Sequence, residues 1–239
     1  MIDELIEIAP LGDSAVIVRF RGNAGDPPRK DLKTVLAAEQ CLKNAQIPGV
    51  IEIAPAYVSI VLFYDPSRVV ISGANVNRVV DWLAEWIRRA ISNTDRNFDQ
   101  AEIRQIEVPV CFELDSDLDE LVRHTGIERQ EIINLYCATE YRVSCIGFTP
   151  GFPFFSGLPR ELAMPRRAIP RKDVPAGSVG IGGSQTGIYP IRSPGGWNII
   201  GRTSLRLFDP QKSPPALLRA GDRVRFRPIP RHEFESSTT

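Results

Sequence analysis

The segment from Pro170 to Thr203 constrains the fold of this 239-residue chain most strongly, because glycine and proline recur in it beside large apolar residues. It reads PRKDVPAGSVGIGGSQTGIYPIRSPGGWNIIGRT. A flexible linker would instead be rich in Gly and Ser and poor in large apolar side chains. Short apolar runs that alternate with turn residues predict tight β-hairpins, in which glycine supplies positive φ or close backbone approach. Such a segment can direct several backbone N–H groups at one small ligand.

The composition excludes several classes of function. Lys plus Arg and Asp plus Glu are balanced at 29 each, so the chain has no electrostatic reason to bind nucleic acid or an anionic membrane. No run of about 18 apolar residues predicts a membrane span, and the start MIDELIEIAP lacks the features of a secretory signal. We therefore expect a cytoplasmic protein without nucleic-acid or membrane partners.

Conventional catalytic devices are scarce in the sequence. The two histidines, His124 and His232, are poorly placed for a Ser-His-Asp or Cys-His arrangement. The four cysteines form no C-x-x-C pair and predict reduced core thiols, and no group of residues has metal-ligand spacing. No lysine follows a glycine, so the Walker A pattern is absent. We expect no metal site, and any ATP must be bound by another device or by another chain.

Apolar periodicity predicts two domains, over residues 1–95 and 96–239, with a polar linker over 92–101. The first domain is expected to contain a strand, a helix, a hairpin and a second helix, and a further strand follows. Their ranges are 14–20, 31–46, 50–65, 75–91 and 104–112. This order matches a ferredoxin-like split βαβ layout.

The second domain is predicted to be mainly β. Two short helices are expected over 117–124 and 128–137, and helical periodicity then vanishes from Tyr141 onward. Short strands are expected in the runs RVSCIGF, SVGIG, GIYPI, WNIIGR, SLRLFD and DRVRFRPI. This pattern indicates a closed barrel or a sandwich.

Arginines and glycine-rich turns are the candidate ligand-binding elements. The turns around Gly177 and over 182–187 either present backbone amides and hydroxyls to an anion or are ordinary β-turns. A basic group formed by Arg166, Arg167, Arg171 and Lys172 either binds carboxylate or phosphate, which suits the fixed fork of arginine, or is a solvated basic loop. The aromatic loop GFTPGFPFFSGL, over 147–158, either closes a barrel end or walls an apolar pocket.

Several long motifs together resemble one bacterial family. The motifs are GFTPGFPFFSGLP, PRKDVPAGSVGIGGSQTGIYP, SPGGWNIIGRT and AGDRVRF, with LGDSAVIVRF and PGVIEIAPAYVSIVLFYDP near the start. The chain is similar over nearly its whole length to the family that comprises KipI, the B component of 5-oxoprolinase (PxpB) and allophanate hydrolase subunit 1. It departs from the family pattern at Tyr136, where a histidine is common.

The resemblance implies a fold, a reaction and partners. It implies an α+β ferredoxin-like N-terminal domain followed by a mainly-β cyclophilin-like barrel domain. The implied activity is ATP-dependent opening of 5-oxoproline to L-glutamate, with Mg²⁺-ATP shared among subunits. The implied partners are the C component of 5-oxoprolinase, also called allophanate hydrolase subunit 2, and a LamB/YcsF-type subunit. The alternatives are KipI-like inhibition of a sensor histidine kinase and hydrolysis of a urea- or allophanate-related amide.

The resemblance and the residues together give a candidate site in the second domain. Arginines are expected to hold carboxylate or phosphate, glycine amides and polar side chains to orient the amide, and aromatic rings to wall the pocket. The substrate- and anion-binding candidates are Arg166, Arg171, Gly177, Ser178, Gly182, Gln185, Thr186, Tyr189 and Arg202. The pocket-wall candidates are Phe148, Phe152 and Trp197. Gln185 and Arg202 are the candidates for a direct catalytic role.

Overall fold

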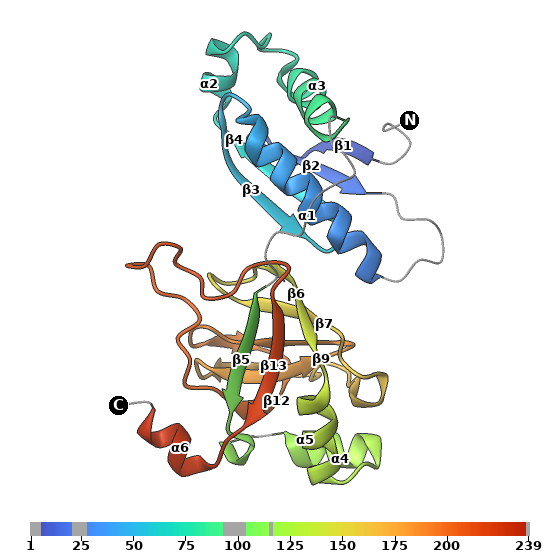
Figure 1. Ribbon diagram of the computed structural model, residues 1–239, viewed down its shortest axis with the longest axis vertical. Helices are drawn as coiled ribbons and strands as arrows, with labels where there is room; N and C mark the ends of the chain where they lie inside the picture. The colour runs from blue at the N-terminus through green and yellow to red at the C-terminus, as the bar shows by residue number, and fades with distance from the viewer. Residues whose placement is uncertain (1–5, 21–27, 93–103, 115–116, 238–239) are drawn as a thin grey trace. The chain divides into compact units, whose positions relative to one another are not determined.

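The computed structural model describes residues 6–20, 28–92, 104–114 and 117–237. These residues are of mixed α/β structure with mostly antiparallel strand pairing, and the chain divides into two compact units, 1–102 and 103–239 (Figure 1). The predicted domain boundary at residues 95 and 96 lies outside the described residues. None of the helices described is both long and apolar enough to cross a membrane.

In the first unit, the described strands form an antiparallel sheet that packs against helices. The strand order is β1 (Ile6–Pro10), β2 (Ala15–Phe20), β4 (Ser59–Tyr64) and β3 (Val50–Ala56). The helices are α1 (Pro28–Ala45), α2 (Pro66–Ile71) and α3 (Val79–Ser92). Alternate side chains of the strands meet the apolar stripes of α1 and α3, as period-2 and period-3.6 patterns require. The buried members include Val16, Val18, Leu42, Ile60, Leu62, Leu83 and Ile87.

Two expectations for the first unit are wrong in detail. The strand expected over 104–112 is β5 (Gln105–Val110), and it pairs in the second unit. The edge position beside β2 is instead taken by β1, a strand that the sequence analysis missed. Helix α3 begins at Val79 rather than at residue 75, because the Asn75 side chain accepts a hydrogen bond from the Asn77 N–H at 2.9 Å. Such a local turn competes with the helix.

The second unit contains a sheet that closes on itself. The strand order begins with β5, β13 (Arg223–Pro228), β6 (Tyr141–Ile146) and β7 (Pro153–Ser156). It continues through β10 (Gln185–Ile188), β9 (Ser178–Gly182) and β12 (Asn198–Arg202). Cys111, which follows β5, exchanges backbone hydrogen bonds of 2.8 and 3.0 Å with Arg202 at the end of β12. The circuit of described strands is therefore closed.

The segment from Ser204 to Asp209 is not a regular strand, contrary to expectation, and pairs only through a bridge between Phe208 and Ala216. A separate two-stranded sheet joins β8 (Arg171–Val174) to β11 (Ser193–Gly195).

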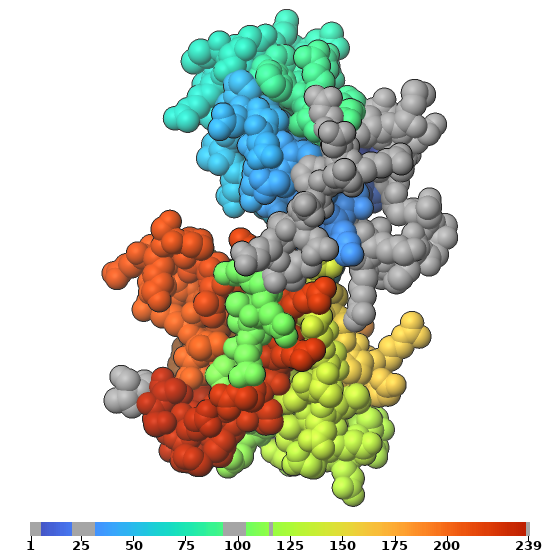
Figure 2. All heavy atoms as spheres, in the orientation of Figure 1, coloured from blue at the N-terminus to red at the C-terminus, as the bar shows by residue number. Residues whose placement is uncertain are grey.

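Short helices surround the closed sheet. The two predicted helices are confirmed as α4 (Leu118–Thr125) and α5 (Arg129–Ala138), and Gly126 ends α4 with a φ of 72°. The remaining helical segments are η2 (Phe112–Leu114), η3 (Arg160–Leu162) and α6 (Arg231–Ser236). Side chains inside the sheet form one core with α4 and α5, and its aromatic members are Phe112, Tyr136, Tyr141, Phe155 and Phe226. β5 and β13 lie at the molecular surface in the view of Figure 2, where they are green and red.

Candidate functional site

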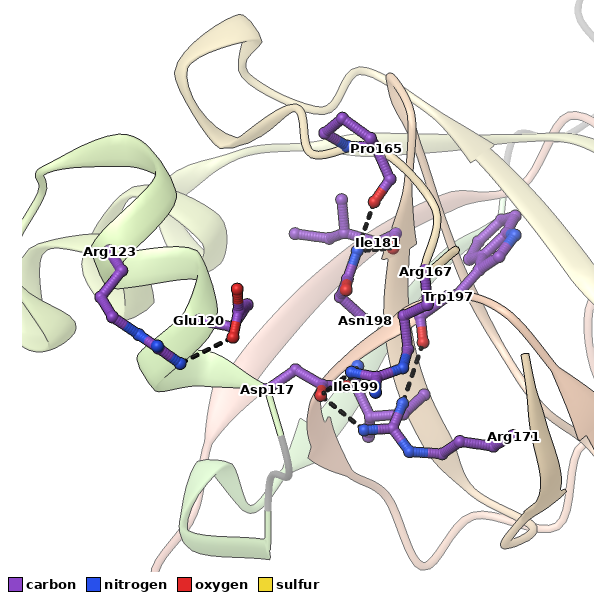
Figure 3. Close-up of polar contacts among 10 residues, drawn as sticks. All are labelled: Asp117, Glu120, Arg123, Pro165, Arg167, Arg171, Ile181, Trp197, Asn198 and Ile199. Atoms are coloured by element: carbon purple, nitrogen blue, oxygen red, sulfur yellow. Dashed lines mark hydrogen bonds and ion pairs between the residues drawn. The ribbon is translucent and has the colours of Figure 1, made fainter. Parts of the chain in front are cut away.

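A buried carboxylate, Asp117, lies at the centre of the candidate site and is only 3% exposed. Its Oδ1 accepts hydrogen bonds from Arg167 at 2.9 Å and from Arg171 at 2.5 Å (Figure 3). Its Oδ2 accepts from the Ile199 N–H at 2.6 Å, and its own N–H donates to the Ile199 carbonyl at 2.9 Å. Both carboxylate oxygens are therefore engaged, which is the condition for burying a charge.

The loop that carries the arginines is fastened to β12 and to the residues before it. The Arg167 N–H donates to the Gly196 carbonyl at 2.7 Å. The buried side-chain amide of Asn198 donates to the Pro165 carbonyl at 2.9 Å and to the Ile181 carbonyl at 3.3 Å (Figure 3). These bonds fix the backbone on both sides of the Arg166 position, so that its side chain projects from a rigid support.

An aromatic cluster lies beside the arginines. The ring of Phe152 meets those of Tyr189 and Trp197 edge-to-face, with centroids 5.1 and 5.6 Å apart. These three side chains are buried, whereas Arg166 is exposed and its Cζ lies 5.7 Å from the centroid of the Trp197 ring. An arginine at this distance from a tryptophan face is favourably placed for a cation–π contact.

Two glycines make this packing possible. A Cβ on Gly182 would lie 2.6 Å from Nε1 of Trp197, and one on Gly195 would collide with the hydroxyl of Tyr189. Both positions therefore require glycine for close approach of the rings to the backbone. The glycine-rich composition noted in the sequence is used here to seat large aromatic side chains.

We call the group formed by Asp117, Arg166, Arg167, Arg171, Tyr189 and Trp197 the arginine–tryptophan cluster. The cluster contains three arginines and one aspartate, so its net charge is +2 (three minus one). Burial raises the pKa of the Tyr189 phenol, and the nearby Arg166 and Arg171 charges partly oppose this shift. The phenol is therefore neutral at physiological pH. A rigid site with surplus guanidinium charge next to aromatic rings is suited to a small oxyanion that has an apolar part.

The structure brings together many of the predicted site residues. Arg166, Arg171, Tyr189 and Trp197 belong to the cluster, and Phe152 and Gly182 pack directly against it. Phe148 contacts Phe152 edge-to-face at 5.5 Å. Gln185 is half-buried in β10 and pairs across the hairpin with Gly182.

Arg202, Gly177 and Ser178 lie in a different environment. The Arg202 Nε donates to the Ala176 carbonyl at 2.9 Å, and its guanidinium lies 5.7 Å from the Phe234 ring. The Gly177 N–H donates to the Tyr189 carbonyl at 2.7 Å, and the Ser178 N–H donates to Pro175 at 3.3 Å. These two amides are therefore used within the chain, and the expected anion cradle at this turn is not formed by them. The N–H of Gly183, in the second turn, is likewise bonded to the Met164 carbonyl at 2.7 Å.

Thr186 faces the interior of the closed sheet and is fully buried. Its hydroxyl donates to the Gly180 carbonyl at 2.9 Å and lies 2.7 Å from the hydroxyl of Tyr136. Burial raises the pKa of Tyr136, so this phenol remains protonated and can donate to Thr186. The tyrosine that departs from the family pattern is thus a core residue hydrogen-bonded to Thr186.

Thr186→Val should lower the free energy of unfolding by about 1–3 kcal/mol, because it leaves the Tyr136 hydroxyl and the Gly180 carbonyl without their partner. Activity per folded molecule should change by less than about twofold, since the side chain lies inside the core. Urea denaturation and steady-state kinetics on the same preparation measure the two effects. A large loss of turnover without loss of stability would instead indicate that Thr186 contacts the substrate.

Asp117, Asn198 and the pairing of Arg167 with Asp117 were not predicted from the sequence. Asp117 stands directly before a short helix, where an aspartate is common as a cap and gives no functional signal. Its arginine partners lie 50 and 54 residues further along the chain, so no local pattern connects them. The one available signal was the group of arginines over 166–171, which needs an acidic partner if it is partly buried.

The chain belongs to the family of the carboxyltransferase domain, subdomain C and D, whose model matches residues 6–218. It is 38% identical over 243 residues to the B component of 5-oxoprolinase from Bacillus subtilis (strain 168), and the match covers 96% of this chain and 95% of that protein. A protein of the same name from Escherichia coli O157:H7 is 38% identical over 225 residues, with 91% and 94% covered.

The fold is also found in a solved structure. The crystal structure of TTHA0988 superposes with a TM-score of 0.74 at 34% identity and covers 90% of this chain. This chain spans only 40% of the TTHA0988 chain.

Proposed function

We propose that the chain is a subunit of an ATP-dependent 5-oxoprolinase that opens the lactam of 5-oxoproline to L-glutamate. The observation that carries this proposal is the likeness, along nearly the whole chain, to two proteins named as the B component of 5-oxoprolinase. The arginine–tryptophan cluster supports it, because 5-oxoproline combines one carboxylate with a compact ring. A guanidinium fork suits the carboxylate, and an aromatic wall suits the ring.

The reaction requires activation of an amide, which is a poor electrophile. In this proposal ATP would transfer its terminal phosphoryl group to the amide oxygen, and water would add to the activated ring carbon. Cleavage of the ring C–N bond, with the nitrogen leaving as a protonated amine, would then give an acyl phosphate, and a second water would hydrolyse this to L-glutamate and phosphate. The contribution of this chain would be positioning and charge stabilisation, with Arg166 and Arg171 holding the carboxylate or a phosphate. Gln185 and Arg202 remain candidates for a direct catalytic role. Arg202 would act from outside the arginine–tryptophan cluster.

The partners are part of the proposal. The guanidinium groups of the cluster suit the oxyanions of ATP. We propose that Mg²⁺-ATP binds at a site shared with the C component of 5-oxoprolinase (allophanate hydrolase subunit 2) and a LamB/YcsF-type subunit. In the same proposal, the first unit is ferredoxin-like and the closed sheet is a cyclophilin-like barrel.

The proposal is tested by purifying the tagged chain gently from its own host and measuring glutamate formed from 5-oxoproline with ATP. Glutamate production that requires both compounds would support it. If partners co-purify but no glutamate forms, the substrate assignment fails. Inhibition of a sensor histidine kinase and turnover of urea-type amides, the two alternatives, are then measured on the same preparation.

A further inference from the structure

The turn at Phe148 has an unfavourable backbone conformation. Phe148 has a φ of 68°, and the Thr149 N–H donates to the Gly147 carbonyl across it at 2.9 Å. A hydrogen bond between residues two apart, around a residue of positive φ, defines the rare and strained form of the γ-turn. For a bulky residue such as phenylalanine, this conformation is a genuine outlier.

The surrounding chain forces this conformation on Phe148. Two further backbone hydrogen bonds of 3.0 Å close the turn, from Gly147 to the Phe152 carbonyl and from Phe152 to the Thr149 carbonyl. Gly151 presses against Phe208, since a Cβ there would lie 2.7 Å from the Phe208 Cβ. Strained residues persist only where the surrounding structure over-determines them in this way.

Packing does not explain why phenylalanine occupies this position. Its side chain is 68% exposed, so it buries little apolar surface in the chain itself. Thr149, the next residue, adds a second unfavourable feature, because its buried hydroxyl has no hydrogen-bond partner among the described residues. Strain and an exposed large apolar side chain in one turn are more typical of a binding element than of a structural one.

The exposed ring extends the aromatic part of the candidate site to the surface. Phe148 meets Phe152 edge-to-face at 5.5 Å, and Phe152 meets Trp197 in the same way at 5.6 Å. Arg166 contacts the other end of this series of rings, at 5.7 Å from the Trp197 centroid. An exposed apolar ring and an exposed guanidinium are thus connected through two buried rings.

We propose that Phe148 is a specificity-determining residue that contacts the apolar face of a small carboxylate whose oxyanion is bound by the arginine–tryptophan cluster. This inference rests on the proposed function. It adds that the Phe148 ring favours ligands that have an apolar face beside their carboxylate. The strained turn holds the ring in its binding position before the ligand arrives, which reduces the ordering cost of binding.

The first test is made on the assembled complex with 5-oxoproline. Phe148→Gly removes the ring and fits the positive φ, so the melting temperature should stay within a few degrees of wild type. The KM for 5-oxoproline should rise about 10-fold or more, with a smaller change in kcat. Phe63→Ala is the matched control, because Phe63 is 41% exposed in β4 of the first unit, and its KM should not change. An unchanged KM in Phe148→Gly, or a loss explained by unfolding, would overturn the inference.

The second test separates this inference from the proposed reaction. In a full-length chain carrying Trp82→Phe and Trp86→Phe, Trp197 is the remaining tryptophan, and its fluorescence reports binding of added benzoate or inorganic phosphate. Phe148→Gly should weaken binding of benzoate about 10-fold and leave binding of phosphate unchanged, because only benzoate has an apolar face. Equal effects on both probes, no effect on either, or no binding of benzoate by the parent chain would each overturn the inference, whatever the complex does with 5-oxoproline.

Discussion

Asp117→Ala should lower the free energy of unfolding of the second unit by about 3–5 kcal/mol, the cost of breaking a buried ion pair. The change leaves Arg167, Arg171 and the Ile199 N–H without a shared acceptor. It also removes one of the two hydrogen bonds between Asp117 and Ile199 of β12, and only the bond from the Asp117 N–H to the Ile199 carbonyl remains. Urea denaturation followed by Trp197 fluorescence, with Trp82 and Trp86 replaced by Phe, reports on this unit specifically.

The matched control for this prediction is Asp173→Ala. Asp173 also pairs with an arginine of the same unit, Arg192, at 3.0 Å, but the two side chains are 52% and 72% exposed. An exposed pair of this kind contributes less than about 1 kcal/mol, since water screens it. If the two substitutions cost the same, Asp117 is not the anchor of the arginine–tryptophan cluster.

Arg166→Ala should reduce kcat/KM for 5-oxoproline about 100-fold in the assembled complex, because a charge-assisted contact to the substrate oxyanion is lost. The substitution should leave the fold intact. The Arg166 side chain is exposed, forms no ion pair among the described residues and contacts Trp197 only from outside. Steady-state kinetics and a melting curve of the same variant separate the effect on binding from an effect on stability.

Two other arginines provide the comparison. Arg192→Ala removes an exposed guanidinium that is paired with Asp173 and should leave kcat/KM unchanged. Arg202→Ala should have a smaller effect than Arg166→Ala, because the Arg202 guanidinium is engaged with Ala176 and Phe234. A larger loss in Arg202→Ala would place the oxyanion outside the cluster.

Local sequence patterns were sufficient for most helices and strands but not for the pairing of strands. The apolar stripes of α1 and α3 and the signals that end α4 involve only nearby residues, so these helices could be predicted directly from the sequence. The strand that pairs with β5 could not be predicted in this way, because the parallel pairing of β5 with β13 joins residues more than a hundred positions apart. An apolar strand that follows the first unit in sequence fits either sheet equally well on periodicity alone.

The types of residue in the candidate site could be predicted from the sequence, but their arrangement in space could not. Arginine beside glycine-rich, aromatic segments indicated an oxyanion and an apolar wall, and Arg166, Arg171 and Trp197 do lie together. The periodicity of β10 was too short to tell which of Gln185 and Thr186 faces the core. Free amides could not be distinguished from bonded ones, because the acceptors of Gly177 and Gly183 come from other segments.

The 5-oxoprolinase assignment is best tested by the rate of ATP hydrolysis by the native complex, measured as 5-oxoproline is added. We expect that the rate of ATP hydrolysis rises with 5-oxoproline to a plateau and equals the rate of glutamate formation. The rise should be largely lost when the chain carries Arg166→Ala. A rate that does not respond to 5-oxoproline, in a complex with its partners attached, would contradict the claim that this chain is part of a 5-oxoprolinase.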